Sequence, residues 1–169
     1  GSFLQATAEG EAALVAAVRD FTGGAARIVD LFSGCGTFSL PLAETAAVHA
    51  VEGLAAPLAA LDAGWRAAPG LNRVTTQNRD LARRPLLADE LNGFDAIVID
   101  PPRAGAEAQA REIAASKAER VAFVACDPVT FSRDARLLAD GGFALKRLRV
   151  VDQFRWSPHV EIVADFART

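Results

Sequence analysis

Apolar residues recur along the chain with two alternating kinds of spacing. In segment 11–21 they fall three and four positions apart, which predicts an amphipathic helix, whereas segment 27–32 is almost continuously apolar, as in a buried strand. The alternation continues to about residue 139. It predicts helices over 11–21, 37–46, 55–67, 106–116 and 128–139, a partly helical stretch over 80–91, and strands over 27–32, 48–52, 72–78, 94–100 and 120–125.

The last two apolar runs, 143–151 and 160–166, predict strands with no helix between them. Such strands pair antiparallel, because a parallel connection needs a crossover. The earlier strands alternate with helices and are apolar on both faces, which indicates a parallel sheet covered on both sides. The predicted fold is therefore α/β: a mostly parallel, seven-stranded sheet with helices on both faces and a C-terminal antiparallel hairpin.

Composition limits the class of protein. The chain has 169 residues, 51% of them hydrophobic, and a net charge of −3, which favours one globular domain over a disordered chain. Gly1-Ser2 has the character of a cloning remnant, so we expect a single domain over 3–169. The longest segment without charged residues, 31–43, is too short to span a bilayer.

Cysteine content and charge indicate the cellular compartment and the kinds of ligand to expect. The two cysteines form neither a disulfide framework nor a metal-ligand spacing, so we expect a cytoplasmic protein without a bound metal. The acidic balance disfavours nucleic-acid binding by bulk charge. Basic residues cluster only at Arg83-Arg84 and at Lys146-Arg147 with Arg149, and we expect ordinary solvated positions there.

Acidic residues follow three successive predicted strands. Segment 30–38 places Gly34 and Gly36 in a tight turn between a strand and a helix, where glycine lets a ligand approach the backbone. Glu52 ends the second strand and is suited to ribose hydroxyls, and Asp80 follows the third, suited to an adenine amino group. The third glycine of a dinucleotide fingerprint is replaced by Ser39. S-adenosylmethionine therefore fits the pattern better than a pyrophosphate ligand.

A thiol follows the fifth predicted strand. Cys126 precedes a helix with Pro128 in its first turn, and Asp127 is placed to cap that helix. Amides at a helix N-terminus favour a thiolate, so we expect Cys126 to be a nucleophile rather than a buried core thiol. Cys35, inside the glycine turn, is expected to be only a small residue.

The pairing of a thiol with a late carboxylate suits one reaction in particular. Uracil C5 is a poor nucleophile, but thiolate addition at C6 makes C5 able to attack a sulfonium methyl group. The C5 proton must then leave to a base. Glu161 is our candidate base, with His159 as the second choice. The Asp100-Pro-Pro-Arg103 turn lacks the aromatic fourth residue that an amino-methyltransferase would stack on its base, which disfavours N-methylation.

At these residues the chain resembles the RNA uracil-C5 methyltransferase family, which has the Rossmann-like class I methyltransferase fold. The resemblance covers the chain from Phe3 onward and looks closer to the 23S ribosomal RNA branch than to the transfer RNA branch. Four segments carry it: Asp30-Leu-Phe-Ser-Gly-Cys-Gly-Thr-Phe-Ser-Leu40, Asp100-Pro-Pro-Arg-Ala-Gly105, Cys126-Asp-Pro with Thr130 and Arg133-Asp134, and Asp152-Gln-Phe-Arg-Trp-Ser-Pro-His-Val-Glu161.

The resemblance implies roles for individual residues. Cys126 would be the nucleophile, Glu161 the base, and Arg103 a neighbour of the target base. The implied S-adenosylmethionine contacts are Gln5, Phe32, Thr37, Glu52, Asp80 and Asp100, in addition to the turn glycines Gly34 and Gly36. The implied partner is ribosomal or transfer RNA, bound by a monomer without a membrane or a metal ion.

The chain departs from the family pattern in two places. Asp127 stands where the family usually has Asn, and an anion beside a thiol opposes thiolate formation. Family members also carry an N-terminal RNA-binding barrel and a central segment, which we expect to be absent from this chain. Two alternatives therefore stay open: a methyltransferase of another specificity on the same fold, and a cofactor-binding module without RNA activity.

Overall fold

The computed structural model describes residues 8–152 and 160–169, which form alternating helices and strands. The helices are α1 (Ala8–Phe21), α2 (Ser39–Leu42), α3 (Ala55–Ala67), α4 (Ala88–Leu91), α5 (Glu107–Ala115) and α6 (Pro128–Asp140). The strands are β1 (Arg27–Leu31), β2 (Ala47–Glu52), β3 (Val74–Asn78), β4 (Ala96–Ile99), β5 (Arg120–Ala125), β6 (Phe143–Asp152) and β7 (Val160–Arg168).

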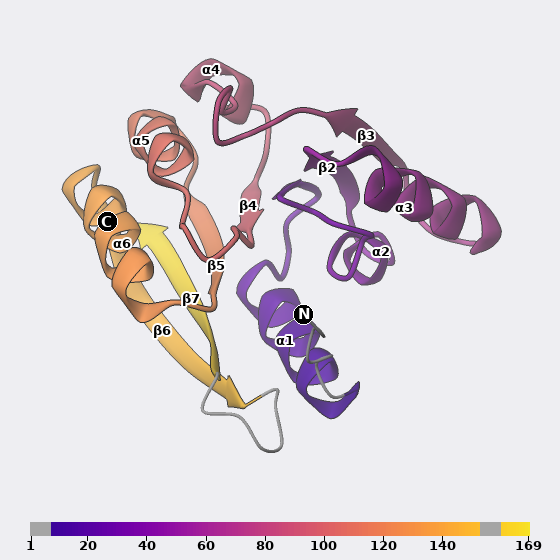
Figure 1. Ribbon diagram of the computed structural model, residues 1–169, viewed down its shortest axis with the longest axis horizontal. Helices are drawn as coiled ribbons and strands as arrows, with labels where there is room; N and C mark the ends of the chain where they lie inside the picture. The colour runs from indigo at the N-terminus through magenta and orange to yellow at the C-terminus, as the bar shows by residue number, and fades with distance from the viewer. Residues whose placement is uncertain (1–7, 153–159) are drawn as a thin grey trace.

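The seven strands make one sheet in the order β3-β2-β1-β4-β5-β7-β6 (Figure 1). The first five strands pair in parallel, and β7 joins both β5 and β6 antiparallel. The chain winds outward from β1 to β3, then returns to β4 on the other side of β1. Ligands of open α/β sheets bind at this change of direction, beyond the carboxyl ends of the strands.

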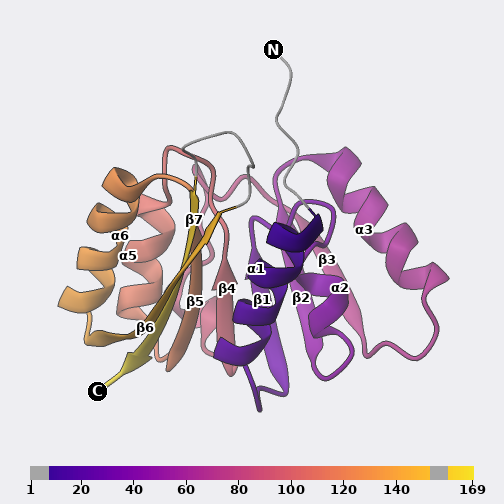
Figure 2. The ribbon, with the colours of Figure 1, turned by 90° about the horizontal axis from the view of Figure 1, so that it is seen from below.

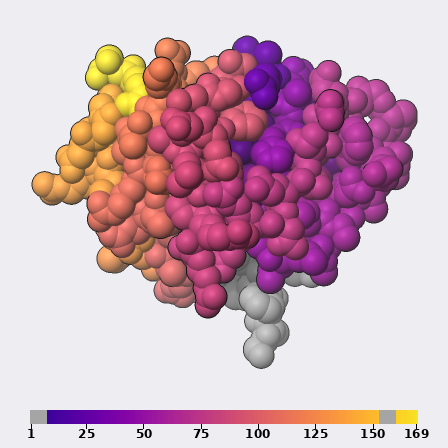
Figure 3. Space-filling view, turned by 90° about the horizontal axis from the view of Figure 1, so that it is seen from above, coloured from indigo at the N-terminus to yellow at the C-terminus, as the bar shows by residue number. Residues whose placement is uncertain are grey.

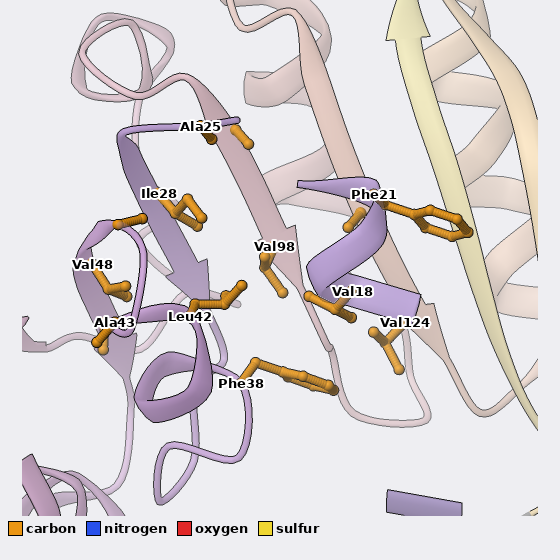
Figure 4. Packing of buried hydrophobic residues seen from close by; sticks show 14 of the residues in the cluster. Val18, Phe21, Ala25, Ile28, Phe38, Leu42, Ala43, Val48, Val98 and Val124 are labelled. Carbon is orange, nitrogen blue, oxygen red and sulfur yellow. The ribbon is translucent and has the colours of Figure 1, made fainter. Parts of the chain in front are cut away.

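Helices cover both faces of the sheet, as the sequence predicts. Figures 1 and 2 show α1, α2 and α3 on one face and α4, α5 and α6 on the other. Each face has its own apolar core. On the first face, α1 and α2 pack on the strands through side chains such as Val18, Phe21, Phe38, Leu42 and Val98, which Figure 4 shows converging between the layers.

The second core lies under α4, α5 and α6. Its large buried side chains include Leu91, Ile113, Phe123, Leu138 and Phe166. Figure 3 looks onto this face, where the segment from β3 to α5 crosses the middle between α3 and α6. Within the described residues, no helix is long and apolar enough to cross a membrane.

Most predicted elements are confirmed, but one helix is much shorter than the pattern suggested. The helix predicted over 37–46 is the single turn α2. The stretch 80–91 is partly helical as predicted, with its helical part in α4. After α2, the chain tightens into turns in which the amide of Glu44 donates to Pro41 and that of Ala46 to Leu42. These turns bring Ala47 onto β1, so sheet pairing ends the helix.

Candidate active site

The pairing of β5 with β7 determines where the candidate nucleophile and base lie. Val124 is opposite Val163 and Ala125 is opposite Ile162 in this antiparallel pair. Cys126 directly follows Ala125, Glu161 directly precedes Ile162, and the charge of Glu161 acts on the Cys126 thiol. The two residues, far apart in sequence, therefore lie near each other at the carboxyl end of the sheet.

Cys126 is exposed at the junction of β5 and α6. Asp127 caps α6 as predicted: its Oδ1 accepts hydrogen bonds from the amides of Val129 at 2.8 Å and Thr130 at 3.4 Å. The predicted thiolate tuning is wrong for this state of the protein. Partial burial raises the pKa of the Cys126 thiol, and the negative charges of Glu161, Asp100 and Asp127 raise it further. These effects outweigh the amides at the start of the helix.

Glu161 is half-buried on β7, and burial raises the pKa of its carboxyl group. Its Oε2 atom is buried and accepts no hydrogen bond from a described residue. Burying a carboxylate oxygen without a partner is costly, so such atoms commonly belong to functional sites. A carboxylate with a raised pKa and a free oxygen is suited to taking up a proton.

Two further carboxyl groups extend this acidic cluster. Burial, followed by the charges of Glu161 and Asp30, raises the pKa of Asp100 well above its ordinary value. Asp30 is fully buried, and its pKa is raised to about 7, mainly by burial. Ser39 donates a hydrogen bond of 2.6 Å to Asp30 Oδ2, whereas Asp30 Oδ1 has no partner among the described residues. Asp30, Asp100, Glu161 and Cys126 are thus electrostatically coupled across β1, β4, β7 and β5.

The turn after β1 adopts backbone conformations that few residues other than glycine tolerate. Gly34 and Gly36 have φ values of 56° and 96°, and Phe32, a rare non-glycine case, has 62°. A Cβ atom on Gly36 would lie 2.9 Å from Leu61 Cγ of α3, which only glycine avoids. Ser33 Oγ, like Asp30 Oδ1, is buried without a partner in the described chain. The turn therefore leaves unsatisfied polar atoms at the carboxyl end of β1.

Glu52 organises the neighbouring loops at the end of β2. Its Oε1 accepts a hydrogen bond of 3.1 Å from the amide of Gly34, and its Oε2 one of 2.8 Å from the amide of Leu54. A carboxylate has about four acceptor positions, so Glu52 can still accept ligand hydroxyls. Asp80 is exposed beside this loop, where Gly53 approaches its backbone, and its Oδ1 accepts the amide of Ala82 at 3.1 Å.

The loop after β4 is fastened to α6. Thr130 Oγ1 donates to the carbonyl of Arg103 at 2.9 Å, and the exposed Arg103 guanidinium lies 3.5 Å from Asp127. Asp134 is fully buried and accepts a hydrogen bond of 2.7 Å from the amide of Ala106. These contacts hold Asp100 and Arg103 beside Cys126. They also give structural roles to Thr130 and Asp134, two residues of the motif around the thiol.

The structure brings together most of the predicted site. Cys126, Glu161, Asp100 and Arg103 lie around one end of β4, β5 and β7, and the remaining cofactor candidates line the ends of β1, β2 and β3: Phe32, Gly34, Gly36, Thr37, Glu52 and Asp80. Gln5 and His159 lie outside the described residues. In the described part of the chain, no cluster of His, Cys, Asp and Glu side chains is arranged to hold a metal ion.

Two features of the site were not predicted from the sequence. The raised pKa of Asp30 depends on its complete burial, for which the only signal was a charged residue inside an otherwise apolar strand. The contact by which Asp134 holds the loop after β4 could not be predicted beyond its place in the motif. Its partner is the backbone amide of Ala106, and every residue other than proline has such an amide.

Solved structures with the same arrangement are methyltransferases. The crystal structure of Pyrococcus abyssi tRNA (uracil-54, C5)-methyltransferase with S-adenosyl-L-homocysteine superposes with a TM-score of 0.85 at 26% identity, over 99% of this chain and 40% of that one. Magnesium protoporphyrin IX methyltransferase from Synechocystis shares the fold alone, at a TM-score of 0.71 and 17% identity over 95% of this chain and 78% of that one. The fold is thus that of class I methyltransferases.

Sequence comparison gives the family. The model of the tRNA (Uracil-5-)-methyltransferase family matches residues 65–166, so the chain belongs to this family. The chain is 55% identical to an uncharacterized RNA methyltransferase of Mesorhizobium japonicum, over 97% of this chain and 40% of the relative. It is 37% identical to the 23S rRNA (uracil(1939)-C(5))-methyltransferase RlmD of Chromohalobacter salexigens, over 95% of this chain and 34% of that protein. The chain therefore spans well under half the length of these relatives.

Proposed function

We propose that this domain transfers a methyl group from S-adenosylmethionine to C5 of a uridine in structured RNA, with Cys126 as nucleophile and Glu161 as base. The observation that carries the proposal is the β5–β7 register, whose last pair, Ala125 and Ile162, brings Glu161 close to Cys126. The family match and the uracil-C5 methyltransferases among the relatives support the same substrate class. The higher identity to the 23S rRNA enzyme than to the tRNA enzyme favours ribosomal RNA.

Cys126 starts the reaction as a thiolate. Its sulfur forms a bond to uracil C6, and the electron pair of the C5–C6 double bond moves to C5, as an enolate-like carbon. Because the pKa of the thiol is raised in the free protein, the proton must first be lost to solvent or to a neighbouring base. The exposure of Cys126 gives a base in RNA direct access to the sulfur.

Glu161 completes the reaction. After C5 has gained the methyl group, the Oε2 atom of Glu161 takes the C5 proton, the C5–C6 double bond forms again, and the C6–sulfur bond breaks to release the thiolate. The free and buried Oε2 atom supports this assignment, since it is available to a proton without first giving up another hydrogen bond. The products are 5-methyluridine, S-adenosylhomocysteine and a proton.

The residues at the ends of β1 and β2 fit S-adenosylmethionine, which supplies an electrophilic methyl group on a positively charged sulfur. Glu52 retains acceptor capacity for ribose hydroxyls beside the glycine turn. Asp30 Oδ1 and Ser33 Oγ are buried polar atoms that need a partner. Asp100, at the end of β4, adds a carboxyl group between this turn and Cys126. The proposed roles of Phe32, Thr37 and Asp80 in cofactor binding rest on the same placement.

A covalent trap tests the proposal. The protein is incubated with S-adenosylmethionine and RNA that contains 5-fluorouridine, and the products are analysed by intact mass under denaturing conditions. Fluorine cannot leave as a proton does, so the methylated RNA should stay bonded to the protein. The adduct should disappear in Cys126→Ala and persist in Cys35→Ala, the matched control for the second exposed thiol. An adduct that survives in Cys126→Ala would refute the assignment of the nucleophile.

The base is tested separately on ordinary RNA. Glu161→Gln keeps the shape of the side chain but cannot take the proton, so a methylated Cys126 adduct should accumulate where the wild-type protein releases its product. Normal turnover by this variant would assign the proton to another base. Methyl transfer to a small molecule that is unaffected by Cys126→Ala would instead favour a methyltransferase of another specificity.

A further inference from the structure

Three of the five residues in the basic clusters of the sequence lie in ion pairs in the fold. Arg147 forms ion pairs with Asp20 at 3.1 Å and with Asp165 at 2.9 Å, and Arg149 also pairs with Asp20. Arg83 lies 3.7 Å from Asp80. A neighbouring carboxylate reduces the attraction of an arginine for a phosphate, so these three arginines are weaker candidates for RNA binding than an unpaired pair of arginines.

The fold assembles a different basic site at the opposite end of the sheet. A cleft of about 260 Å³ lies where β1, β2 and β3 begin, and its lining includes Arg27 and Arg73. Both arginines are exposed, and neither forms an ion pair with a carboxylate of the described chain.

The walls of the cleft hold its charged groups in place. The Arg27 guanidinium lies 5.4 Å from the centre of the Phe94 ring, and His49 stacks on the same ring at 6.1 Å. His49 is fixed by Thr75, whose Oγ1 is 2.7 Å from Nδ1. The Phe94 ring thus positions the guanidinium of Arg27, and Arg73 and the hydroxyl of Thr75 belong to the same lining. Two guanidinium groups in one cleft are suited to binding a phosphate group. The volume also suffices, since a water molecule takes up only about 30 Å³.

The catalytic end carries more carboxyl groups than cations. Asp80 and Asp127 lie in ion pairs with Arg83 and Arg103. Burial raises the pKa of Asp30, Asp100 and Glu161, and Glu52 lies in no ion pair of the described chain. RNA must place a uridine at this acidic end although its backbone is negatively charged. A cationic contact elsewhere on the domain would offset that repulsion.

The two ends are separated by a distance that one RNA strand can span. The six residues of β2 extend about 20 Å at roughly 3.3 Å per residue, and Cys126 follows β5, which lies three strand spacings of about 4.8 Å from β2. The cleft and the thiol are therefore about 25 Å apart, which corresponds to about seven nucleotides of a stacked strand at about 3.4 Å each. We propose that the cleft between Arg27 and Arg73 binds a backbone phosphate of the RNA substrate, about seven nucleotides from the uridine that is methylated. This inference rests on the proposed function for its choice of ligand.

Salt-dependent binding tests the cleft without requiring turnover. The affinity for a fluorescein-labelled single-stranded RNA of more than about ten nucleotides is measured by anisotropy between about 25 and 200 mM salt. Arg73→Ala should weaken binding several-fold at low salt and lower the slope of log K against log salt by about 0.7, the value for one lost phosphate contact on a single strand. Arg73→Lys should restore most of the slope.

Arg136→Ala is the matched control, because Arg136 is exposed on α6, outside the cleft, and its replacement removes the same charge. It should leave the slope unchanged. Equal effects of Arg73→Ala and Arg136→Ala would overturn the proposal, as would the absence of RNA binding by the wild-type chain at low salt. Inorganic phosphate that perturbs the amides around Arg73, while the RNA slope stays unchanged in Arg73→Ala, would identify a site for free anions and also overturn it.

The outcome is independent of the methylation experiment. Binding is measured without S-adenosylmethionine and can be repeated in Cys126→Ala, so a failed covalent trap leaves the result for Arg73 intact. Conversely, a successful trap together with an unchanged salt slope in Arg73→Ala would support the proposed reaction and reject the cleft alone.

Discussion

Replacing Gly105 by alanine adds a single methyl group, which should cost stability in two ways. It should strain the backbone, and it should disturb the contact between the loop and α6. Gly105 ends the loop that carries Asp100 and Arg103, with φ at +81°. A Cβ atom there would lie 2.5 Å from Arg133 Nη2 and 2.8 Å from Asp134 Oδ2. Arg133 Nη2 is the end of a flexible, partly exposed side chain and can move, but Asp134 cannot easily give way because it is fully buried and bonded to the amide of Ala106. Gly105→Ala should therefore loosen the loop from α6.

The expected cost has two parts. A non-glycine residue in the left-handed region costs about 1–2 kcal/mol. Displacing the Asp134 carboxylate from the amide of Ala106 leaves a buried donor unpaired, which costs about a further 1–3 kcal/mol. The free energy of unfolding of Gly105→Ala should thus fall by about 2–5 kcal/mol. Because small domains are stable by about 5–15 kcal/mol, the variant should still fold at low temperature.

Gly24 provides the control, since its φ of +82° matches that of Gly105 and a Cβ atom there meets nothing within 4 Å. Gly24→Ala should cost only the conformational part, about 1–2 kcal/mol. Urea unfolding of both variants, followed by circular dichroism, gives the two values. Equal losses would refute the argument that Asp134 and Arg133 hold the loop, because the packing contribution would then be absent.

Three further predictions concern the acidic cluster. Burial raises the pKa of Asp30 from 3.8 to about 7, so the folded chain keeps a proton that the unfolded chain loses, and stability should fall from pH 4 to pH 7 by at most about 4 kcal/mol. In Asp30→Asn, urea unfolding at several pH values should show that fall much reduced; an unchanged profile would assign it to other groups. Partial burial and then the charge of Glu161 raise the pKa of Cys126, so Glu161→Gln in a Cys35→Ser background should be alkylated faster by iodoacetamide at pH 8, and an unchanged or slower rate would contradict this. In the same Cys35→Ser background, S-adenosylmethionine should speed alkylation of Cys126 more than S-adenosylhomocysteine does, because only the former has a positively charged sulfur; equal rates would count against binding of the cofactor with its sulfur close to the thiol.

The sequence predicted the elements well because each kind of burial leaves its own pattern. A strand buried on both faces leaves a continuous apolar run, and a helix buried on one face leaves apolar residues three and four positions apart. It also predicted that the last two strands pair with each other. It gave no sign that β7 inserts between β5 and β6, although this insertion is what brings Glu161 to Cys126. Strand order depends on which edges remain open after the parallel strands pair, and that is a property of the whole sheet rather than of any segment.

Electrostatics was the harder part to predict. The helix cap by Asp127 was predicted and is confirmed, yet the expected lowering of the thiol pKa is wrong because Glu161 and Asp100 lie nearby. Similarly, three arginines of the basic runs, Arg83, Arg147 and Arg149, are paired with acids in the fold. Arg27 and Arg73, by contrast, are brought together only by the parallel pairing of β1, β2 and β3. A charge acts over distances in space, and local sequence reports only its neighbours in the chain.

The same carboxyl groups explain both the resting state of the thiol and the need for a distant RNA contact. A proton acceptor at Glu161 and hydroxyl or cation acceptors at Glu52 and Asp100 require negative or ionisable groups at the carboxyl end of the sheet. Those groups raise the pKa of Cys126, and their negative charge opposes the approach of the RNA backbone. Attraction supplied elsewhere on the domain would offset this repulsion. The cleft that contains Arg27 and Arg73 can supply it, because neither arginine forms an ion pair within the described chain.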